Sequence, residues 1–416
     1  MSLIYRILLS VSFTFLIGSG LYFSIKLGFP QLKINSLFKG LKKDENTNIS
    51  PLKSMMLSLA ARIGVGSLSG IALAIYIGGE GTLFWIWIGS IITCILTYCE
   101  TYLGQKYQVK INNAYVGGPS YYIKNKNIAL LYAVILILTY TLGFLPIQAN
   151  TIVKSMTNYL NINIYLITII ILIITIIPII GDTNKIMNLT SKIVPIIGLF
   201  YLLLTIYVLI RNISLIPNII LTIIKKAFNI KAFTSSFIPS LIIGIQRGIF
   251  ITESGLGTSS IATSCTYTKD KISLSLSQIL GIYFTVFIVC TSTAFLIMTS
   301  NYKDIIITTT NGIELTQYAY MYHLGNIGSL VLLISIFFLA YSTIVAGYFY
   351  SESSFKFISN KIYILKLITI FSILIGCIIN ATKLWNIADI LVEILIIINV
   401  YYLFKYRKEI VFDYKK

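Results

Sequence analysis

Charged residues are scarce in this chain, and acidic residues are the scarcest of them. Only 11% of the 416 residues are charged, with 32 Lys and Arg against 14 Asp and Glu. Soluble domains carry about 25% charged residues, so there is little room here for a soluble domain. The net charge of +18 does not indicate a nucleic-acid partner, because the Lys and Arg residues lie mostly in loops between apolar runs, where such residues orient membrane helices.

Histidine and cysteine are also rare. The single histidine is His323, and the five cysteines all lie in or next to apolar runs. They lack metal-ligand spacing, which disfavours a zinc site or a disulfide framework. An enzyme is the least expected class of function, because Ser67, Ser254 and Glu253 are the only reactive candidates and no base is placed for a triad. Residues 1–27 lack a small-residue cleavage site and are expected to be a retained helix rather than a signal peptide.

Long apolar runs are what the chain has in abundance. Hydrophobic residues make up 56% of the sequence, and the mean hydropathy is +0.86. A membrane-spanning helix needs about 20 apolar residues. The runs are continuous rather than alternating, which disfavours an outer-membrane barrel and predicts an all-α polytopic membrane protein. About eleven transmembrane helices are expected, at residues 4–27, 54–77, 83–104, 128–153, 164–180, 188–210, 237–264, 275–299, 328–352, 363–380 and 384–405.

Two of these runs are interrupted by glycine and serine, at residues 61–70 and 247–260. Glycine costs about 1 kcal/mol relative to alanine inside a helix, and non-helical backbone is not tolerated facing lipid. If the first helix is set aside, ten helices remain, and each half of five begins with a break. An odd number of spans separates corresponding helices, so the halves have opposite orientation, which is the inverted-repeat pattern of transporters with a central solute site.

This pattern predicts the organisation of the chain and its topology. Loops on one side of the predicted helices hold more than twice as many Lys and Arg residues as the other side, and the basic excess marks the cytoplasmic face. We therefore expect the N-terminus outside and the C-terminus in the cytoplasm. The expected parts are an extra N-terminal helix (1–27), a cytoplasmic loop (28–53), a first repeat (54–210), an external loop (211–236), a second repeat (237–405) and a cytoplasmic tail (406–416).

A break inside a membrane helix exposes backbone groups that can bind a solute. Its free N–H groups suit a carboxylate and its free C=O groups suit a cation. Gly64, Gly66 and Gly70 would let a ligand approach the backbone closely, and Ser67 adds a hydroxyl. The alternative is tight helix packing through these same small residues.

Several polar residues in apolar runs are further candidates. Arg247 and Glu253 are intramembrane charges, which usually face a cavity or pair with each other; alternatively Arg247 lies near the membrane surface with Glu253 as its structural partner. Glu100 lies near a helix end and could be interfacial. Ser342 and Thr343 offer oxygens that suit a hard cation, although such hydroxyls more often bond the carbonyl of the preceding turn.

Amides form another candidate group. Gln148 and Asn150 lie at the end of a long apolar helix. They could contact a substrate or make interfacial hydrogen bonds.

Short blocks along most of the chain resemble the alanine or glycine:cation symporter family in the family's order. The blocks that carry the resemblance are Ser50-Pro51, residues 60–70, Gly78-Gly79-Glu80-Gly81 with Phe84-Trp85-Ile86-Trp87, Glu100 with Lys106-Tyr107, residues 117–123, Gln148-Ala149-Asn150, residues 247–257 and Ala340-Tyr341-Ser342-Thr343.

The resemblance implies a leucine-transporter-like fold in the plasma (inner) membrane of a bacterium, and sodium- or proton-coupled uptake of a small neutral amino acid. No cofactor is implied beyond a sodium ion as coupling ion. The implied substrate residues are Gly64, Gly66, Ser67, Gly70, Gln148, Phe250, Thr252 and Gly255. The implied sodium ligands are Ala61, Gly64, Ser342 and Thr343, and the implied gating or structural charges are Arg62, Glu100, Arg247 and Glu253.

Three positions depart from the family pattern. The family usually has Asn at Ser67 and at Thr252, and Pro at Glu80. Two lost amides remove donors that could fix a ligand, while the hydroxyls still offer oxygens to a cation. Proton coupling, an altered substrate or lost activity in a drifted paralogue therefore stay open beside sodium-coupled alanine or glycine symport. A passive channel is less expected, because paired breaks in inverted halves favour alternating access.

Overall fold

Helices account for almost all of the chain in the computed structural model, which describes residues 3–42, 49–111, 114–160, 162–180, 183–229, 237–305 and 312–416. The α-helices are α1 (Leu3–Leu27), α2 (Ile34–Lys39), α3 (Pro51–Arg62), α4 (Ile71–Gly78), α5 (Thr82–Lys106), α6 (Pro119–Tyr122), α7 (Lys126–Leu138), α8 (Leu145–Leu160), α9 (Ile164–Ile180), α10 (Thr183–Arg211), α11 (Ile216–Ala227), α12 (Ile238–Thr252), α13 (Thr258–Ser264), α14 (Lys271–Tyr283), α15 (Thr291–Met298), α16 (Tyr302–Ile305), α17 (Gly312–Ile358), α18 (Ile362–Ile378), α19 (Ala381–Lys405) and α20 (Arg407–Lys415).

Shorter helical turns connect some of these helices. The π-helical segments are η2 (Gly66–Gly70), η3 (Thr139–Phe144) and η7 (Phe284–Cys290), and the 3₁₀ turns are η1 (Pro30–Leu32) and η4 (Ile213–Leu215). Each π segment continues directly into an α-helix, so η3 joins α7 to α8 and η7 joins α14 to α15. Such π segments are frequent at functional sites, and η2 lies in the first predicted break.

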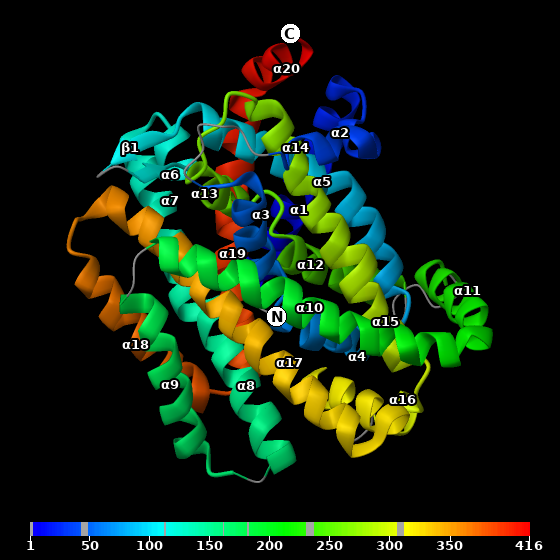
Figure 1. The fold of residues 1–416 in the computed structure, drawn as a ribbon. Helices are drawn as coiled ribbons and strands as arrows, with labels where there is room; N and C mark the ends of the chain where they lie inside the picture. Colours follow the sequence, from blue (N-terminus) through cyan, green and yellow to red (C-terminus); the bar gives the residue numbers. More distant parts are fainter. Residues whose placement is uncertain are drawn as a thin grey trace.

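One short hairpin interrupts the otherwise helical fold. Strands β1 (Val109–Ile111) and β2 (Ala114–Val116) pair antiparallel, with Lys110 opposite Tyr115. The hairpin lies in the loop expected at 105–127, at the same end of the molecule as α2, α20 and the C-terminus (Figure 1). It is the only sheet in the part of the chain that the structure describes, and the all-α class therefore holds with this small addition.

The helices agree with the apolar runs of the sequence. Seven described helices are long and apolar enough to span a membrane, and an eighth is the pair α3 and η2–α4, bent by 49°. Three shorter apolar helices, α9, α12 and α18, fall in further predicted runs. Every one of the eleven expected ranges thus contains helix, although seven or eight meet the length criterion. The start of α3 at Pro51 is fixed by Ser50, whose side chain accepts a hydrogen bond from the Lys53 N–H.

Helix also occurs in two stretches between the predicted spans. The loop expected at 211–236 holds η4 and α11, and residues 230–236 lie outside the described part. The polar stretch at 301–327 holds α16 and the first part of α17, which begins at Gly312 and kinks at Gly325, where φ is 62°. The apolar run expected from residue 328 is therefore the second part of a bent helix.

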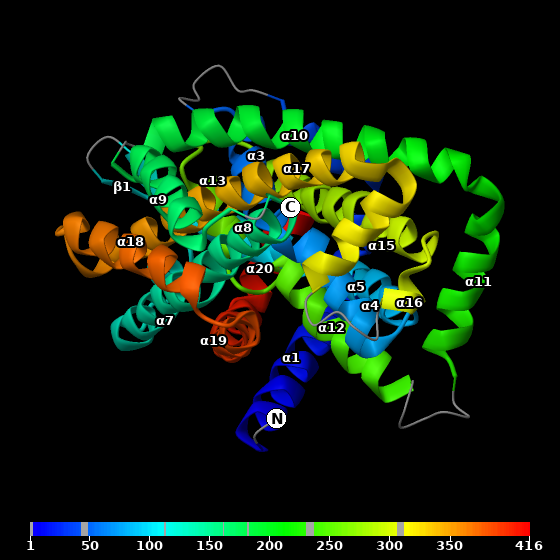
Figure 2. The same cartoon turned by 90° about the horizontal axis from the view of Figure 1, so that it is seen from below.

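The two interrupted helices lie inside the bundle. Helix α12 packs against α4 and α5, and α3 packs against α10, α13 and α17. Figure 2 shows α10 along one edge of the bundle, with α11 turning away at its end and α1 on the opposite side. This arrangement keeps the irregular backbone of both breaks away from lipid, as the absence of water in a bilayer requires.

Candidate functional site

The first break separates α3 from η2 and α4. Helix α3 ends at Arg62, and Ile63 follows with φ −89° and ψ 73°, outside the helical region. One released backbone group finds a partner on α8, because the Val65 N–H donates to Gln148 Oε1 at 3.0 Å. All ten residues from 61 to 70 are buried. Gln148 therefore contacts the first break.

The second break separates α12 from α13. Three of its residues have positive φ: Glu253 (53°), Gly255 (80°) and Gly257 (97°). A non-glycine residue in this region is uncommon, and Glu253 is held there through both carboxylate oxygens. Tyr140 OH donates to Oε1 at 3.0 Å and Thr258 Oγ1 donates to Oε2 at 2.8 Å. The loop is thus a fixed structure and not a frayed helix end.

Helix α17 meets the first break at Thr343. Its Oγ1 lies 2.7 Å from the Ala60 carbonyl oxygen and 3.0 Å from that of Leu339. A Cβ built on Gly64 would stand 2.3 Å from the same Oγ1. The predicted cation residues Gly64 and Thr343 are therefore in direct contact, and Ala61 lies in the last turn of α3 beside them.

Two hydroxyls of the candidate site bond within their own segments. Ser342 Oγ donates to the Leu339 carbonyl at 2.8 Å, and Ser67 Oγ donates to the Gly64 carbonyl at 2.9 Å. Ser342 thus makes the preceding-turn bond that was the alternative for this residue. Both oxygens keep lone pairs that can accept a hydrogen bond or contact a cation.

An aromatic stack covers the glycines of η2. The Phe250 ring lies parallel to Phe144 at 4.3 Å between centroids, and 4.6 Å from the Trp385 ring. A Cβ on Gly66 would stand 3.3 Å from Phe250, and one on Gly70 would stand 3.7 Å from Trp385. Phe250 therefore joins the second break to the first. Phe144 and Trp385 were not anticipated, because nothing in their local sequence separates them from other buried aromatic residues.

Arg247 pairs with α19 and not with Glu253. Its Nη2 lies 2.8 Å from Asp389 Oδ2, and its guanidinium stacks 4.5 Å above the centroid of Trp385. Gln246 Nε2 donates to the same carboxylate oxygen at 2.5 Å. Pairing of Arg247 with Glu253, one of the alternatives considered from the sequence, is wrong, since the partner is Asp389 and both ends of the Arg247–Asp389 pair are buried. Asp389 is a residue that sequence reasoning missed.

A second polar cluster ties α3 and α5 to α13. Arg62 Nη2 donates to Ser259 Oγ at 2.5 Å. Glu100 Oε2 accepts from the Gly257 N–H at 2.9 Å and from Asn399 Nδ2 at 3.3 Å. Glu100 is fully buried between α5, α13 and α19, where these hydrogen bonds hold it.

The remaining candidates occupy the edges of the site. Thr252 is buried, and its Oγ1 accepts from the Ser254 N–H at 3.3 Å. A Cβ on Gly255 would point toward Leu16 of α1, at 2.7 Å, so that side of Gly255 is packed away from the first break. Asn150 Nδ2 donates to the carbonyls of Gly376 and Ile379 at 2.9 and 2.7 Å, which fixes α8 to α18 and leaves Asn150 outside the site.

Comparison with known proteins identifies the family of the chain. The profile of the sodium:alanine symporter family matches residues 2–416. The chain belongs to the sodium:alanine symporter family. It is a membrane transporter of that family with multiple spans, and not an enzyme.

Three relatives share about the same degree of similarity. The chain is 32% identical to an uncharacterised transporter of Haemophilus influenzae, over 92% of this chain and 83% of that protein. It is 30% identical to the amino-acid carrier protein AlsT of Bacillus subtilis (93% and 85% covered). It is also 30% identical to the probable sodium/glutamine symporter GlnT of Bacillus subtilis (94% and 84% covered).

The fold is shared more widely than the family. The structure resembles that of the Eremococcus coleocola manganese transporter, solved in complex with an aromatic bis-isothiourea substituted compound. The TM-score is 0.52 at 11% sequence identity, covering 83% of this chain and 76% of that one. At this identity the likeness extends to the fold alone.

Proposed function

We propose that this symporter-family chain couples sodium entry to uptake of a small neutral amino acid, alanine or glycine. The observation that carries the proposal is the contact of Thr343 with the first break, because it puts a hydroxyl, the free end of α3 and the Gly64 backbone at one point. Unwound backbone at the middle of a membrane transporter is where solutes and coupling ions bind. Membership of the family supports amino acid transport driven by a cation.

The proposed sodium ligands come from α3 and α17. The last carbonyls of a helix lack partners inside the helix, and Ala61 carries such a group in the last turn of α3, while Gly64 offers its carbonyl from the break that follows. Ser342 and Thr343 add hydroxyl oxygens from the facing helix. Oxygen ligands suit a hard cation, and the negative end of the α3 dipole favours positive charge there.

The proposed amino acid lies between the two breaks. The N–H groups at the start of η2 favour its carboxylate, and Gly66 and Gly70 let it approach the backbone. Ser67, Gln148, Thr252 and Gly255 are the proposed polar and backbone contacts. Phe250 limits the size of the side chain, since its ring lies against the position where a Cβ on Gly66 would stand.

Two polar clusters flank the site and are proposed as its gates. Arg247 and Asp389 close the side formed by α4 and α12. Arg62, Glu100 and Glu253 close the side formed by α3 and α13. Residues 61–70 and 246–266 are buried throughout, so both gates are shut in this conformation. Alternating access requires each cluster to open in turn. The proposed topology is a five-plus-five inverted repeat with the N-terminus outside and the C-terminus in the cytoplasm.

Uptake by purified protein in proteoliposomes tests the proposal. An inward sodium gradient should drive radiolabelled alanine above its equilibrium level, and replacing sodium by choline should abolish the accumulation. Accumulation that persists without sodium under an imposed proton gradient would refute sodium coupling. Equilibration without accumulation indicates a channel, and no flux at all indicates a drifted paralogue. Competition by unlabelled glycine and glutamine separates a small substrate from the larger one named for GlnT.

A further inference from the structure

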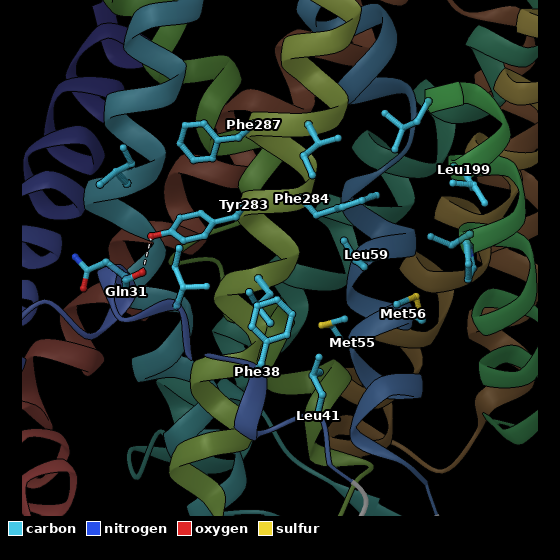
Figure 3. Close-up of a pocket in the computed structure, with 18 of the residues that line it drawn as sticks. Gln31, Phe38, Leu41, Met55, Met56, Leu59, Leu199, Tyr283, Phe284 and Phe287 are labelled. Carbon is cyan, nitrogen blue, oxygen red and sulfur yellow. Dashed lines mark hydrogen bonds between the residues drawn. The ribbon is translucent and has the colours of Figure 1, made fainter. Parts of the chain in front are cut away.

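A large apolar groove lies on the side of the bundle, against α3 but outside the candidate site. It has a volume of about 820 Å³ and is bounded by the segment containing η1 and α2 and by α3, α10 and the junction of α14 with η7. Figure 3 shows Phe38 and Leu41 on one wall, Met55, Met56 and Leu59 of α3 on another, and Tyr283, Phe284 and Phe287 on a third. Sites for organic ligands have volumes of about 300–1,000 Å³. None of the proposed substrate or cation residues lines it.

The lining of the groove is almost entirely hydrocarbon. Gln31 and Tyr283 are the only lining residues with polar side chains, and Tyr283 OH donates to the Gln31 carbonyl at 2.9 Å. The rim reaches the surface, where Leu32 is 61% exposed, Phe38 55% and Leu199 58%. Exposed apolar side chains are ordinary on the lipid-facing surface of a membrane protein, and what distinguishes this place is the recess that they surround.

Lysine residues flank the groove on the segment that contains η1 and α2 and at the start of α3. Lys33, Lys39, Lys42 and Lys53 are all exposed, and each lies within two residues of a residue that lines the groove. The segment with η1 and α2 is attached to the bundle through α2, which packs on α14 so closely that a Cβ on Gly40 would overlap the Ser273 carbonyl. Asp270, near this contact, already caps α14 by accepting from the Ser273 N–H at 2.9 Å. Asp44 and Glu45 lie outside the described residues.

We propose that this groove binds one anionic glycerophospholipid, with an acyl chain in the groove and its phosphate at the lysines. The apolar recess suits the hydrocarbon, and basic residues next to membrane helices attract anionic headgroups. A recess walled by five parts of the chain, Ile91 of α5 included, distinguishes this site from the general lipid contact of a flat helix surface. A lipid in the groove would also contact α3 through Met55, Met56 and Leu59, and Leu59 lies one turn before the first break.

Two groups of variants separate the acyl site from the headgroup site. A Cβ on Gly198 meets no atom within 4 Å although the residue lines the groove, so Gly198→Phe is the variant chosen to fill the groove. Gly18 on α1 is equally open, and Gly18→Phe is the matched control outside the groove. The headgroup variant is Lys33→Gln with Lys39→Gln and Lys42→Gln. Its control removes three other exposed lysines, Lys124, Lys126 and Lys361.

Native mass spectrometry of the purified full-length protein, titrated with dioleoyl-phosphatidylglycerol or dioleoyl-phosphatidylcholine, measures the binding. We expect one phosphatidylglycerol to bind at least about tenfold more tightly than phosphatidylcholine. Gly198→Phe should weaken both lipids, and the triple Lys→Gln variant should weaken only phosphatidylglycerol, by about tenfold or more. Equal binding of the two lipids, or variants that behave as their controls, would overturn the proposal. The assay contains neither amino acid nor sodium gradient, so its result is independent of the proposed transport.

Discussion

Gly64 and Thr343 are packed so closely that no side chain fits between them. A Cβ on Gly64 would stand 2.3 Å from Thr343 Oγ1 and 3.0 Å from Gln148 Oε1. The hydroxyl cannot turn aside freely, because it is anchored to the carbonyls of Ala60 and Leu339. The close packing of α17 and α8 therefore requires a glycine at position 64, whether or not a ligand also approaches the backbone there.

Gly64→Ala should abolish most transport while the protein still folds. The added methyl group displaces Thr343 from the end of α3 or pushes α3 away from α17, and overpacking of this kind costs about 1–3 kcal/mol. Sodium-driven alanine uptake and the thermal unfolding midpoint should both fall. Gly18→Ala is the control, since its Cβ meets no atom within 4 Å. Wild-type uptake by Gly64→Ala would contradict the packing and the proposed ion site together.

Thr343→Val should raise the sodium concentration needed for half-maximal uptake by about tenfold or more, which corresponds to the loss of about 1.4 kcal/mol. Valine keeps the shape of threonine but removes the oxygen beside Ala60. Thr343→Ser keeps the oxygen and should retain most of the sodium affinity. Uptake measured against sodium at saturating alanine checks both variants. A Val variant with unchanged sodium dependence would remove Thr343 from the ion site.

The sequence is informative about segments and much less about their partners. Helix α9 spans Ile164–Ile180, the range expected from its apolar run alone, because length and composition are local properties. The breaks are local in the same way. Arg247 and Asp389 are 142 residues apart, so their pairing depends on how α12 and α19 pack. An available signal was that Asp389 lies in an apolar run, where an ionisable residue is a candidate for function.

Long-range packing also decided which polar residues joined the site. Gln148 and Asn150 are two residues apart on α8, and their local sequence alone did not distinguish them, although the family resemblance implied only Gln148 as a substrate residue. The helix turns about 200° between them, so Gln148 meets the first break while Asn150 meets α18. The packing of Gly255 against α1 could not be predicted from the sequence either, because α1 lies outside both predicted repeats.

Asp389→Asn should destabilise the protein by about 3–5 kcal/mol, because it leaves the buried Arg247 guanidinium without its counter-charge. The double variant Arg247→Met with Asp389→Leu removes both charges and should recover much of that stability. If the pair acts as a gate, the double variant folds but transports poorly. Thermal unfolding and uptake of the same preparations separate the two effects. A double variant with wild-type uptake would show that the pair serves structure alone.

Glu80 should give the contact between the α4–α5 turn and α16 a dependence on pH. Its Oε1 accepts from Tyr302 OH at 2.6 Å and lies 3.7 Å from Lys303 Nζ. Burial alone would raise its pKa, but the Tyr302 hydrogen bond and the nearby lysines Lys303 and Lys226 hold the pKa below its ordinary value. A depressed pKa in the folded state means that the stabilisation is present above the unfolded pKa and is lost as pH falls through the folded pKa.

Glu80→Gln should therefore lower stability at neutral pH, by about 1–2 kcal/mol for a hydrogen bond to a charged group, and have no effect once the wild-type carboxyl is protonated. The difference between the unfolding midpoints of wild type and variant should thus be largest at pH 6–8 and shrink below about pH 4. Tyr302→Phe is the matched variant, because it removes the donor and leaves the carboxylate. If the unfolding midpoints of wild type and variant differ by the same amount at neutral and at acidic pH, the charge on Glu80 does not hold the turn to α16.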